Sequence, residues 1–205
     1  MQGISANNKR IARNTFIVYL QLAITMIINL VMARFVLQAL GASDFGLYNV
    51  VGGIIGLFTF ISGSMAATTI RFLNYEMGKP DGDVNKVYNQ SIVLHISIAL
   101  LILILLETVG LFYICNYLNV DVTRMADALF VFHLSAIITC LGIISVPLQS
   151  IFVSYEHFGV TAIIEVVSVI LKFLLSILLV YYEGNALRLY AIGMSVIACL
   201  SFIAY

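Results

Sequence analysis

Five polar side chains share one face of a long apolar segment near residue 170. Their spacings of four, three, four and four residues are typical of one face of an α-helix: Thr161, Glu165, Ser168, Lys172 and Ser176. Glu165 and Lys172 would lie about 10 Å apart along such a helix, too far for direct contact. A charge at the centre of a membrane-spanning helix costs at least ~2.5–3.5 kcal/mol, so both side chains should face a bundle interior or a wet cavity. Two interpretations stay open: salt bridges to other helices, or a hydrophilic lumen that contacts substrate or a coupling ion.

A second polar face and two arginines are further candidates for substrate binding. Gln21, Thr25 and Asn29 follow a four-residue spacing along the first apolar segment, and we expect them to line the same cavity. Arg34, near the outer end of that segment, either snorkels to the lipid head groups or faces the cavity. Arg71 ends the second apolar segment, where it either anchors the helix at the membrane surface or contributes to the cavity.

Proline and glycine predict the shape of two segments. Pro147 interrupts the fourth apolar segment and frees a backbone carbonyl one turn earlier, so we predict a hinge there. In the second segment, Gly52 and Gly56 form a GxxxG pair, and Gly63 continues roughly the same face. Small residues let helix backbones approach closely in a bilayer, so these glycines predict either close helix packing or a smooth sliding face.

The sequence carries no recognisable catalytic or metal centre. It has no glycine-rich phosphate loop with a lysine, no HExxH sequence and no nucleophile elbow. Cys115, Cys140 and Cys199 lie in apolar stretches without metal-ligand spacing, so we expect them to pack as small apolar residues. Ten basic residues balance ten acidic ones, so no excess of positive charge indicates nucleic acid as a partner. We therefore predict that the protein is not an enzyme and holds no cofactor or metal.

Membrane-spanning helices must position these side chains. The 205 residues are 62% hydrophobic and 10% charged, whereas a soluble domain is ~45–50% apolar and ~25% charged, which excludes a soluble globular fold. Continuous apolar runs without two-residue alternation predict helices, and strands are not expected. At ~20–25 residues per span, residues 1–205 form one all-α polytopic membrane domain with about six spans. The predicted spans are 14–40, 45–76, 87–117, 127–155, 157–182 and 187–205.

The distribution of lysine and arginine orients this bundle. With the N-terminus in the cytoplasm, the inner side holds Lys9, Arg10, Arg13, Arg71, Lys79 and Lys86. The outer side holds Arg124 and Arg188, with Arg34 if that side chain reaches the outer face. Because basic residues favour the cytoplasmic side, we predict a cytoplasmic N-terminus, and an even number of spans returns the C-terminus to the same side.

Three short motifs occupy the first third of the chain. They are Asn8–Thr15 (NKRIARNT), Leu40–Gly53 (LGASDFGLYNVVGG) and Arg71–Gly78 (RFLNYEMG). With these motifs at the ends of its first two spans, the chain resembles bacterial O-antigen and polysaccharide flippases of the Wzx type. That branch belongs to the superfamily that also contains the multidrug and toxin extrusion transporters.

The resemblance implies a carrier in the bacterial inner membrane. Such carriers move undecaprenyl-pyrophosphate-linked sugar repeat units from the inner to the outer leaflet, for O-antigen, capsule or lipopolysaccharide biosynthesis. They resemble two six-helix lobes around a cavity that opens alternately to either side. Basic residues would then meet the pyrophosphate, and hydroxyl and amide groups would meet the sugars. The candidates are Arg34, Arg71 and Lys172 for the anion, and Gln21, Thr25 and Asn29 for the sugars.

Members of this family usually have about twice as many spans, so we expect the chain to correspond to an N-terminal lobe. Its partner would be a missing C-terminal lobe or a second copy, related by an axis along the membrane normal. A cation-coupled multidrug extrusion transporter is the alternative function, although the first span carries no acid, and Arg34 and Lys172 would repel cationic drugs. The third hypothesis is a truncated remnant that inserts into the membrane and transports nothing.

Overall fold

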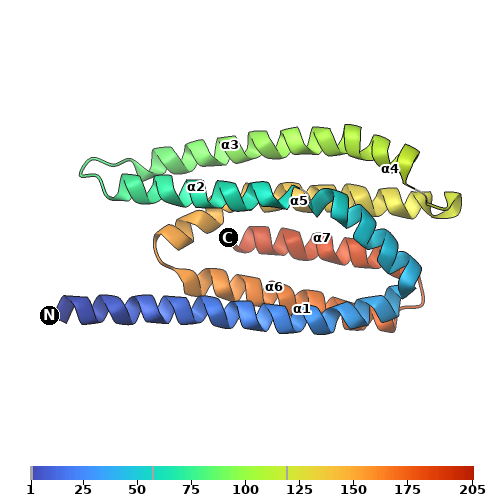
Figure 1. The fold of residues 1–205 in the computed structure, drawn as a ribbon, viewed down its shortest axis with the longest axis horizontal. Helices are drawn as coiled ribbons and strands as arrows, with labels where there is room; N and C mark the ends of the chain where they lie inside the picture. The colour runs from blue at the N-terminus through green and yellow to red at the C-terminus, as the bar shows by residue number, and fades with distance from the viewer. Residues whose placement is uncertain (1, 57, 119) are drawn as a thin grey trace.

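The computed structural model describes residues 2–56, 58–118 and 120–205, which form an elongated bundle of antiparallel helices (Figure 1). The elements in chain order are α1 (Gln2–Gly56), α2 (Thr59–Met77), α3 (Val84–Leu105), the π-helix η1 (Leu106–Gly110), α4 (Leu111–Tyr117), the 3₁₀ turn η2 (Val122–Arg124), α5 (Met125–Ser154), α6 (Phe158–Val180) and α7 (Ala186–Ala204). Within these described ranges there is no strand. The predicted all-α fold is confirmed.

A bend at Gly41 divides α1 into a first arm, residues 2–40, and a second arm, residues 42–56. Gly41 has φ 71° and ψ 169°, a conformation that side chains with a Cβ rarely adopt. In Figure 1 the first arm follows one long side of the bundle, and the second arm turns across its end toward α2. The bend therefore coincides with the boundary predicted between the spans 14–40 and 45–76.

The segment 45–76 differs from the prediction, because two helices replace one continuous helix. The second arm ends at Gly56, and α2 begins at Thr59. The backbone N–H of Phe58 donates to the carbonyl of Ile55 across 3.0 Å, which closes a turn between them. Glycine costs about 1 kcal/mol per residue in a helix relative to alanine, and three glycines precede the break within five residues, at positions 52, 53 and 56.

Five helical stretches are long and apolar enough to cross a membrane: Asn8–Gly53, Val84–Tyr117, Met125–Ser154, Phe158–Val180 and Ala186–Ala204. Large apolar side chains point outward on all of them, as lipid-facing helices require. The remaining predicted span corresponds to the second arm of α1 together with α2, which runs back toward the N-terminal end of the bundle (Figure 1). The chain is an α-helical membrane protein.

Helix α5 is the centre of the packing. It contacts α1, α2, α3 and α7, and its Val131, Phe132, Ala136 and Ile143 are fully buried. The first arm of α1 lies instead on the outside, where α1 packs mainly against α6 and touches α2 very little. This arrangement leaves space between α1 and α2, and it brings α5, α6 and α7 together.

Local sequence signals mark the starts of two helices, and a proline lies inside α5. The side chain of Asp83 accepts a hydrogen bond from the backbone N–H of Lys86 at the start of α3 (2.9 Å), and Asn185 accepts one from Arg188 at the start of α7 (3.0 Å). Pro147 is buried within α5, and the helix continues through it. The hinge predicted at Pro147 stays a prediction.

Candidate functional site

A polar cavity of about 160 Å³ lies between α5, α6 and α7. Three residues of the predicted α6 stripe, Glu165, Ser168 and Lys172, line it because α6 turns that face toward its two neighbours. The facing helices add further polar groups: Ser145 and Gln149 from α5, Ser201 from α7, and Tyr205 just after α7. The structure therefore brings together the two charges of the stripe with four uncharged groups on other elements.

Hydrogen bonds satisfy one side of the polar cavity. The hydroxyl of Tyr205 donates to Oε1 of Glu165 across 3.1 Å. The amide of Gln149 donates to Oγ of Ser145 (3.1 Å), which in turn donates to the carbonyl of Gly142 (2.8 Å). Lys172 is half-buried and makes no hydrogen bond or ion pair with a residue in the described part of the chain. The predicted salt bridges from Glu165 and Lys172 to other helices are thus not formed between described residues, and the ammonium of Lys172 faces the cavity without a counter-ion.

The other two residues of the stripe use their hydroxyls locally. Thr161 donates to the carbonyl of Phe158 (3.0 Å), and the buried Ser176 donates to the carbonyl of Phe173 (2.7 Å). Hydroxyls that bond to their own helix in this way satisfy the side chain without a second helix. Neither residue lines the polar cavity.

The predicted candidates on α1 and α2 lie apart from the polar cavity. Gln21 lines a separate, mostly apolar groove between α1 and α6, and the half-buried Thr25 has a hydroxyl oxygen without a partner among the described residues. Asn29 and Arg34 on α1 and Arg71 on α2 are exposed. The first arm meets α6 through apolar side chains, so its amide face does not reach Glu165 and Lys172. Substrate binding by these five residues stays a prediction.

A much larger cavity of about 890 Å³ lies between the first arm of α1 and α2, at the N-terminal end of the bundle. We refer to it as the α1/α2 cavity. Its walls are mostly apolar, with polar groups from four elements at one end. The lining residues are Ile11, Asn14, Thr15, Val18, Tyr19, Leu22, Ile70, Asn74, Met77, Gly78, Val153, Ser154, Glu156 and Phe158.

An ion pair holds the polar end of the α1/α2 cavity. Arg10 Nε lies 2.9 Å from Glu156 Oε2, and the amide nitrogen of Asn14 donates to the same oxygen across 3.3 Å. Glu156 has a φ of 60°, an uncommon conformation for a residue with a long side chain. Asn14 is buried, and the hydroxyl oxygen of Ser154 is buried without a hydrogen-bond partner among the described residues. Positions 14 and 156 are 142 residues apart, so no local pattern could have joined them.

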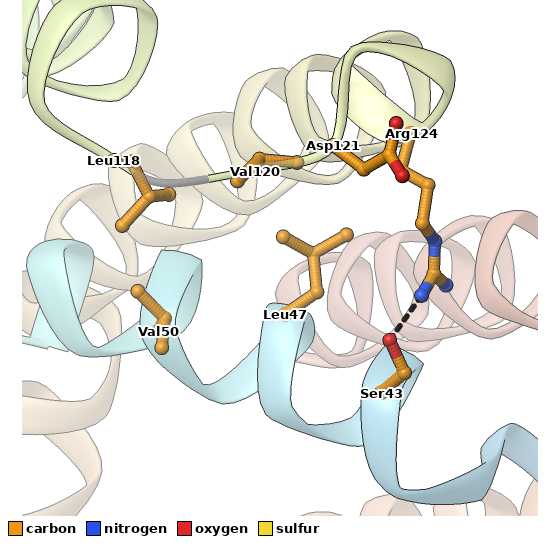
Figure 2. Close-up of a pocket in the computed structure, with 7 residues that line it drawn as sticks. All are labelled: Ser43, Leu47, Val50, Leu118, Val120, Asp121 and Arg124. Atoms are coloured by element: carbon orange, nitrogen blue, oxygen red, sulfur yellow. Dashed lines mark hydrogen bonds between the residues drawn. The ribbon is translucent and has the colours of Figure 1, made fainter.

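A third pocket, of about 220 Å³, lies at the opposite end of the bundle. Figure 2 shows Arg124 reaching from η2 to Ser43 on the second arm of α1, with Asp121 beside it. The guanidinium also pairs with Asp44. The backbone N–H and hydroxyl of Thr123 both donate to Asp121 (3.0 and 2.9 Å), and these bonds hold the pKa of Asp121 below its usual value. The contacts of Arg124 therefore join the second arm of α1 to the turn before α5.

A carboxylate–imidazole pair joins the π-helix to α5. Glu107 in η1 lies 2.9 Å from Nδ1 of His133, and both side chains are partly exposed. A π-helix inserts an extra residue into a helix turn, which changes the direction of the side chains that follow. The two residues are 26 positions apart, and no local spacing in the sequence indicates that they meet.

The predicted packing glycines do not make close contacts within the described residues. A Cβ atom added at Gly52, Gly56 or Gly63 would meet no atom within 4 Å. Close packing occurs instead at Gly110, where a Cβ would lie 2.9 Å from Phe132, and at Gly193, where it would lie 2.5 Å from Leu175. Close packing at these three glycines is therefore not seen among the described residues, and their role as a packing or sliding face stays a prediction.

Among the residues that the structure describes, no group of three or more His, Cys, Asp or Glu side chains could hold a metal ion. Cys115 and Cys199 are exposed and Cys140 is partly buried, all three as free thiols. Comparison with protein-family models, curated proteins and solved structures finds no match to this chain.

Proposed function

We propose that this chain forms one lobe of a membrane transporter that carries lipid-linked oligosaccharides from the inner to the outer leaflet of a bacterial inner membrane. The observation that carries the proposal is Lys172, which lines a polar cavity between apolar helices and has no ion-pair partner among the described residues. Ionisable groups at membrane depth are energetically expensive, and they commonly mark the path of a substrate or ion. The motifs in residues 8–78 support the same class of carrier.

The size of the polar cavity decides which part of a substrate it can take. A volume of about 160 Å³ corresponds to roughly five water molecules at ~30 Å³ each. A phosphate group fits such a space, whereas an oligosaccharide does not. We therefore assign Lys172 to the pyrophosphate, and we keep Arg34 and Arg71 as further anion candidates.

Proteoliposomes test this proposal with the full protein and a fluorescent, short-chain polyprenyl-pyrophosphate oligosaccharide. The rate at which the probe becomes accessible on the other leaflet is the measured quantity. Loss of one charged hydrogen bond, worth ~1.5–3 kcal/mol, predicts that Lys172→Met lowers this rate by about tenfold or more. Lys172→Arg should keep most of the rate, and Lys86→Gln, which removes an exposed lysine near the N-terminal end of α3, is the matched control. Transport by Lys172→Met at the wild-type rate would overturn the proposal.

One observation favours cation-coupled drug extrusion as a second candidate. Glu165 has no basic partner among the described residues and accepts only the hydroxyl of Tyr205, so it is available to a proton or a cation. Efflux of cationic dyes from cells that lack their own exporters tests this candidate. Drug extrusion predicts that the wild-type protein exports the dye and that Glu165→Gln does not. Glu183→Gln, which changes an exposed carboxylate, is the control and should export the dye as the wild type does.

A further inference from the structure

We infer that Glu107 and His133 together form a proton-binding site that fixes α4 to the rest of the bundle. With one proton the pair has no net charge and holds the π-helix η1 against α5. Without that proton, η1 and α4 separate from α5. The inference goes beyond the proposed function and does not rest on it, because the movement of α4 can be followed without transport.

The local structure of η1 places the two side chains opposite each other. Oε1 of Glu107 lies 2.9 Å from Nδ1 of His133. Gly110 at the end of η1 allows this approach, because a Cβ atom there would lie 2.9 Å from Cζ of Phe132 on α5. The hydroxyl of Thr108 donates to a backbone carbonyl one turn earlier (2.6 Å), so it does not compete for the carboxylate.

The pair lies at a depth where a net charge is unfavourable. The two stretches that carry it, Val84–Tyr117 and Met125–Ser154, are long and apolar enough to cross a membrane. Tyr113 and Tyr117 are exposed on α4, and tyrosine is enriched where a membrane meets water. Glu107 precedes Tyr113 by six residues, which corresponds to about 9 Å along a helix. The carboxylate therefore lies on the membrane side of this aromatic belt, where charge is energetically expensive.

The number of protons on the pair decides its net charge. With one proton, an imidazolium faces a carboxylate or a neutral imidazole faces a carboxylic acid, and the net charge is zero in both arrangements. Loss of that proton leaves a carboxylate beside a neutral imidazole, which carries one net negative charge. Apolar surroundings disfavour the charged form, so the carboxylate of a proton-free pair must move toward water. Histidine side chains change charge between about pH 5 and 8, which sets the range for a test.

No other ionisable side chain among the described residues makes a hydrogen bond or ion pair with Glu107 or His133. On the surrounding elements, the side chains with contacts of their own are Asp127 with Arg188, Arg124 with Asp44, Tyr48 with Tyr190, Tyr113 with Tyr117, Cys140 with the carbonyl of Ala99, and His95 with the carbonyl of Ser91. Those at the N-terminal end of the bundle are Arg71, Tyr75 and Glu76 on α2 and Lys86 and Tyr88 on α3, while Glu165 and Lys172 line the polar cavity. The charge of the pair is therefore set by its own two members.

The position of α4 depends on η1. Helix α4 packs mainly against η1 and only slightly against α5, and Ile114 is its one buried residue. Leu118 and Asp121, which follow α4, line the pocket in Figure 2, where Arg124 contacts the second arm of α1. Release of η1 from α5 therefore frees α4 and changes one wall of that pocket.

Spin labelling at a native cysteine tests the inference with the full protein in phospholipid nanodiscs. Cys115 is exposed on α4, so a nitroxide is attached there in the variant Cys140→Ala/Cys199→Ala. The electron paramagnetic resonance spectrum gives the ratio of mobile to immobilised label. Because a net charge at membrane depth is costly, we expect this ratio to rise by about tenfold from about pH 5 to about pH 8. An unchanged ratio would overturn the inference.

Two variants separate the proton on this pair from other effects of pH. Glu107→Gln gives a pair that is neutral without the proton and positively charged with it, so the response should reverse, with more mobile label at the lower pH. Glu107→Gln/His133→Gln has no titrating group, and its two amides can still form a hydrogen bond, so the ratio should not change with pH. A response equal to that of the wild type in either variant would overturn the proton site.

Matched controls use a distant histidine and the other exposed cysteine. His157→Gln changes an exposed histidine between α5 and α6, and its label on Cys115 should respond to pH as in the wild type. A label on Cys199 of α7, in the variant Cys115→Ala/Cys140→Ala, should keep the same ratio at both pH values. Loss of the response in His157→Gln would place the proton elsewhere, and an equal response at Cys199 would mean that the whole bundle loosens. Either result would overturn the inference.

Discussion

The hydroxyl of Tyr205 donates a hydrogen bond to the carboxylate of Glu165 across 3.1 Å, although 40 residues separate them in the chain. The bond connects the end of α7 to the middle of α6 at the edge of the polar cavity. Tyr205 therefore takes part in both the packing of two helices and the hydrogen bonding of the only acid that lines this cavity in the described structure.

Removal of this hydroxyl should destabilise the bundle modestly. Tyr205→Phe loses one hydrogen bond to a carboxylate, worth ~1.5–3 kcal/mol at most, because water in the cavity can replace part of it. For a chain of this length, about 1 kcal/mol lowers the thermal midpoint by roughly 2–4 °C. Thermal unfolding in detergent measures the change. Tyr19→Phe, which removes a hydroxyl from a side chain that is 68% exposed, is the control; equal midpoints for the two variants would contradict the prediction.

The contact between Gly193 and Leu175 predicts a steric effect between α7 and α6. A Cβ at position 193 would lie 2.5 Å from Cδ2 of Leu175, so Gly193→Ala should destabilise by ~1–3 kcal/mol. The double variant with Leu175→Ala should recover part of this loss, as a double-mutant cycle would show.

Gly63→Ala is the control for that cycle, since its added methyl group meets nothing within 4 Å and alanine favours a helix by up to ~1 kcal/mol. It should leave the unfolding free energy unchanged or raise it. The same loss of stability at positions 63 and 193 would contradict this account of glycine packing.

Asp127 and Arg188 form a surface ion pair that salt should weaken. Arg188 Nε lies 2.5 Å from Asp127 Oδ1, and Asn185 donates to the same carboxylate across 3.2 Å. Exposed pairs are worth ~0.2–1 kcal/mol, so Asp127→Asn should lower the unfolding free energy by that amount at low salt. The difference should shrink at ~1 M salt, where the screening length falls to ~3 Å. Glu183→Gln should have no such salt dependence, and a salt-independent Asp127→Asn effect would argue against the ion pair.

The hydrogen bonds from Thr123 to Asp121 predict that the stability of the protein depends on pH. The bonds from Thr123 lower the pKa of Asp121 in the folded protein, so their stabilising effect is complete above the unfolded pKa of ~3.9 and is lost as the pH falls through the lower folded value. Thr123→Val removes the hydroxyl donor. Its thermal midpoint should therefore lie below that of the wild type near neutral pH, and the gap should close at acidic pH. A gap that widens as the pH falls would have the wrong sign.

The sequence predicts the helices and one face of α6, because both depend on local periodicity. Continuous apolar runs require helices in lipid, and the spacing of Glu165, Ser168 and Lys172 places them on one face wherever the helix packs. All three line the polar cavity in the structure.

The relations between helices could not be predicted in the same way. The polar face of α1 resembles that of α6, yet α1 meets α6 through apolar side chains, so Gln21 and Asn29 lie away from Lys172. The GxxxG pattern indicates small residues and does not indicate whether a helix covers them. Asn14 and Glu156 meet across 142 residues, and only the tertiary structure brings them together.

The packing of α1 on α6 has a consequence for biosynthesis. The first arm ends near residue 40, and its main partner begins at Phe158. At a synthesis rate of about 5–20 residues per second, roughly 6–24 seconds pass between the synthesis of the end of the first arm and the synthesis of the start of α6. During that time lipid or the insertion machinery must cover the face of the first helix that later packs against α6.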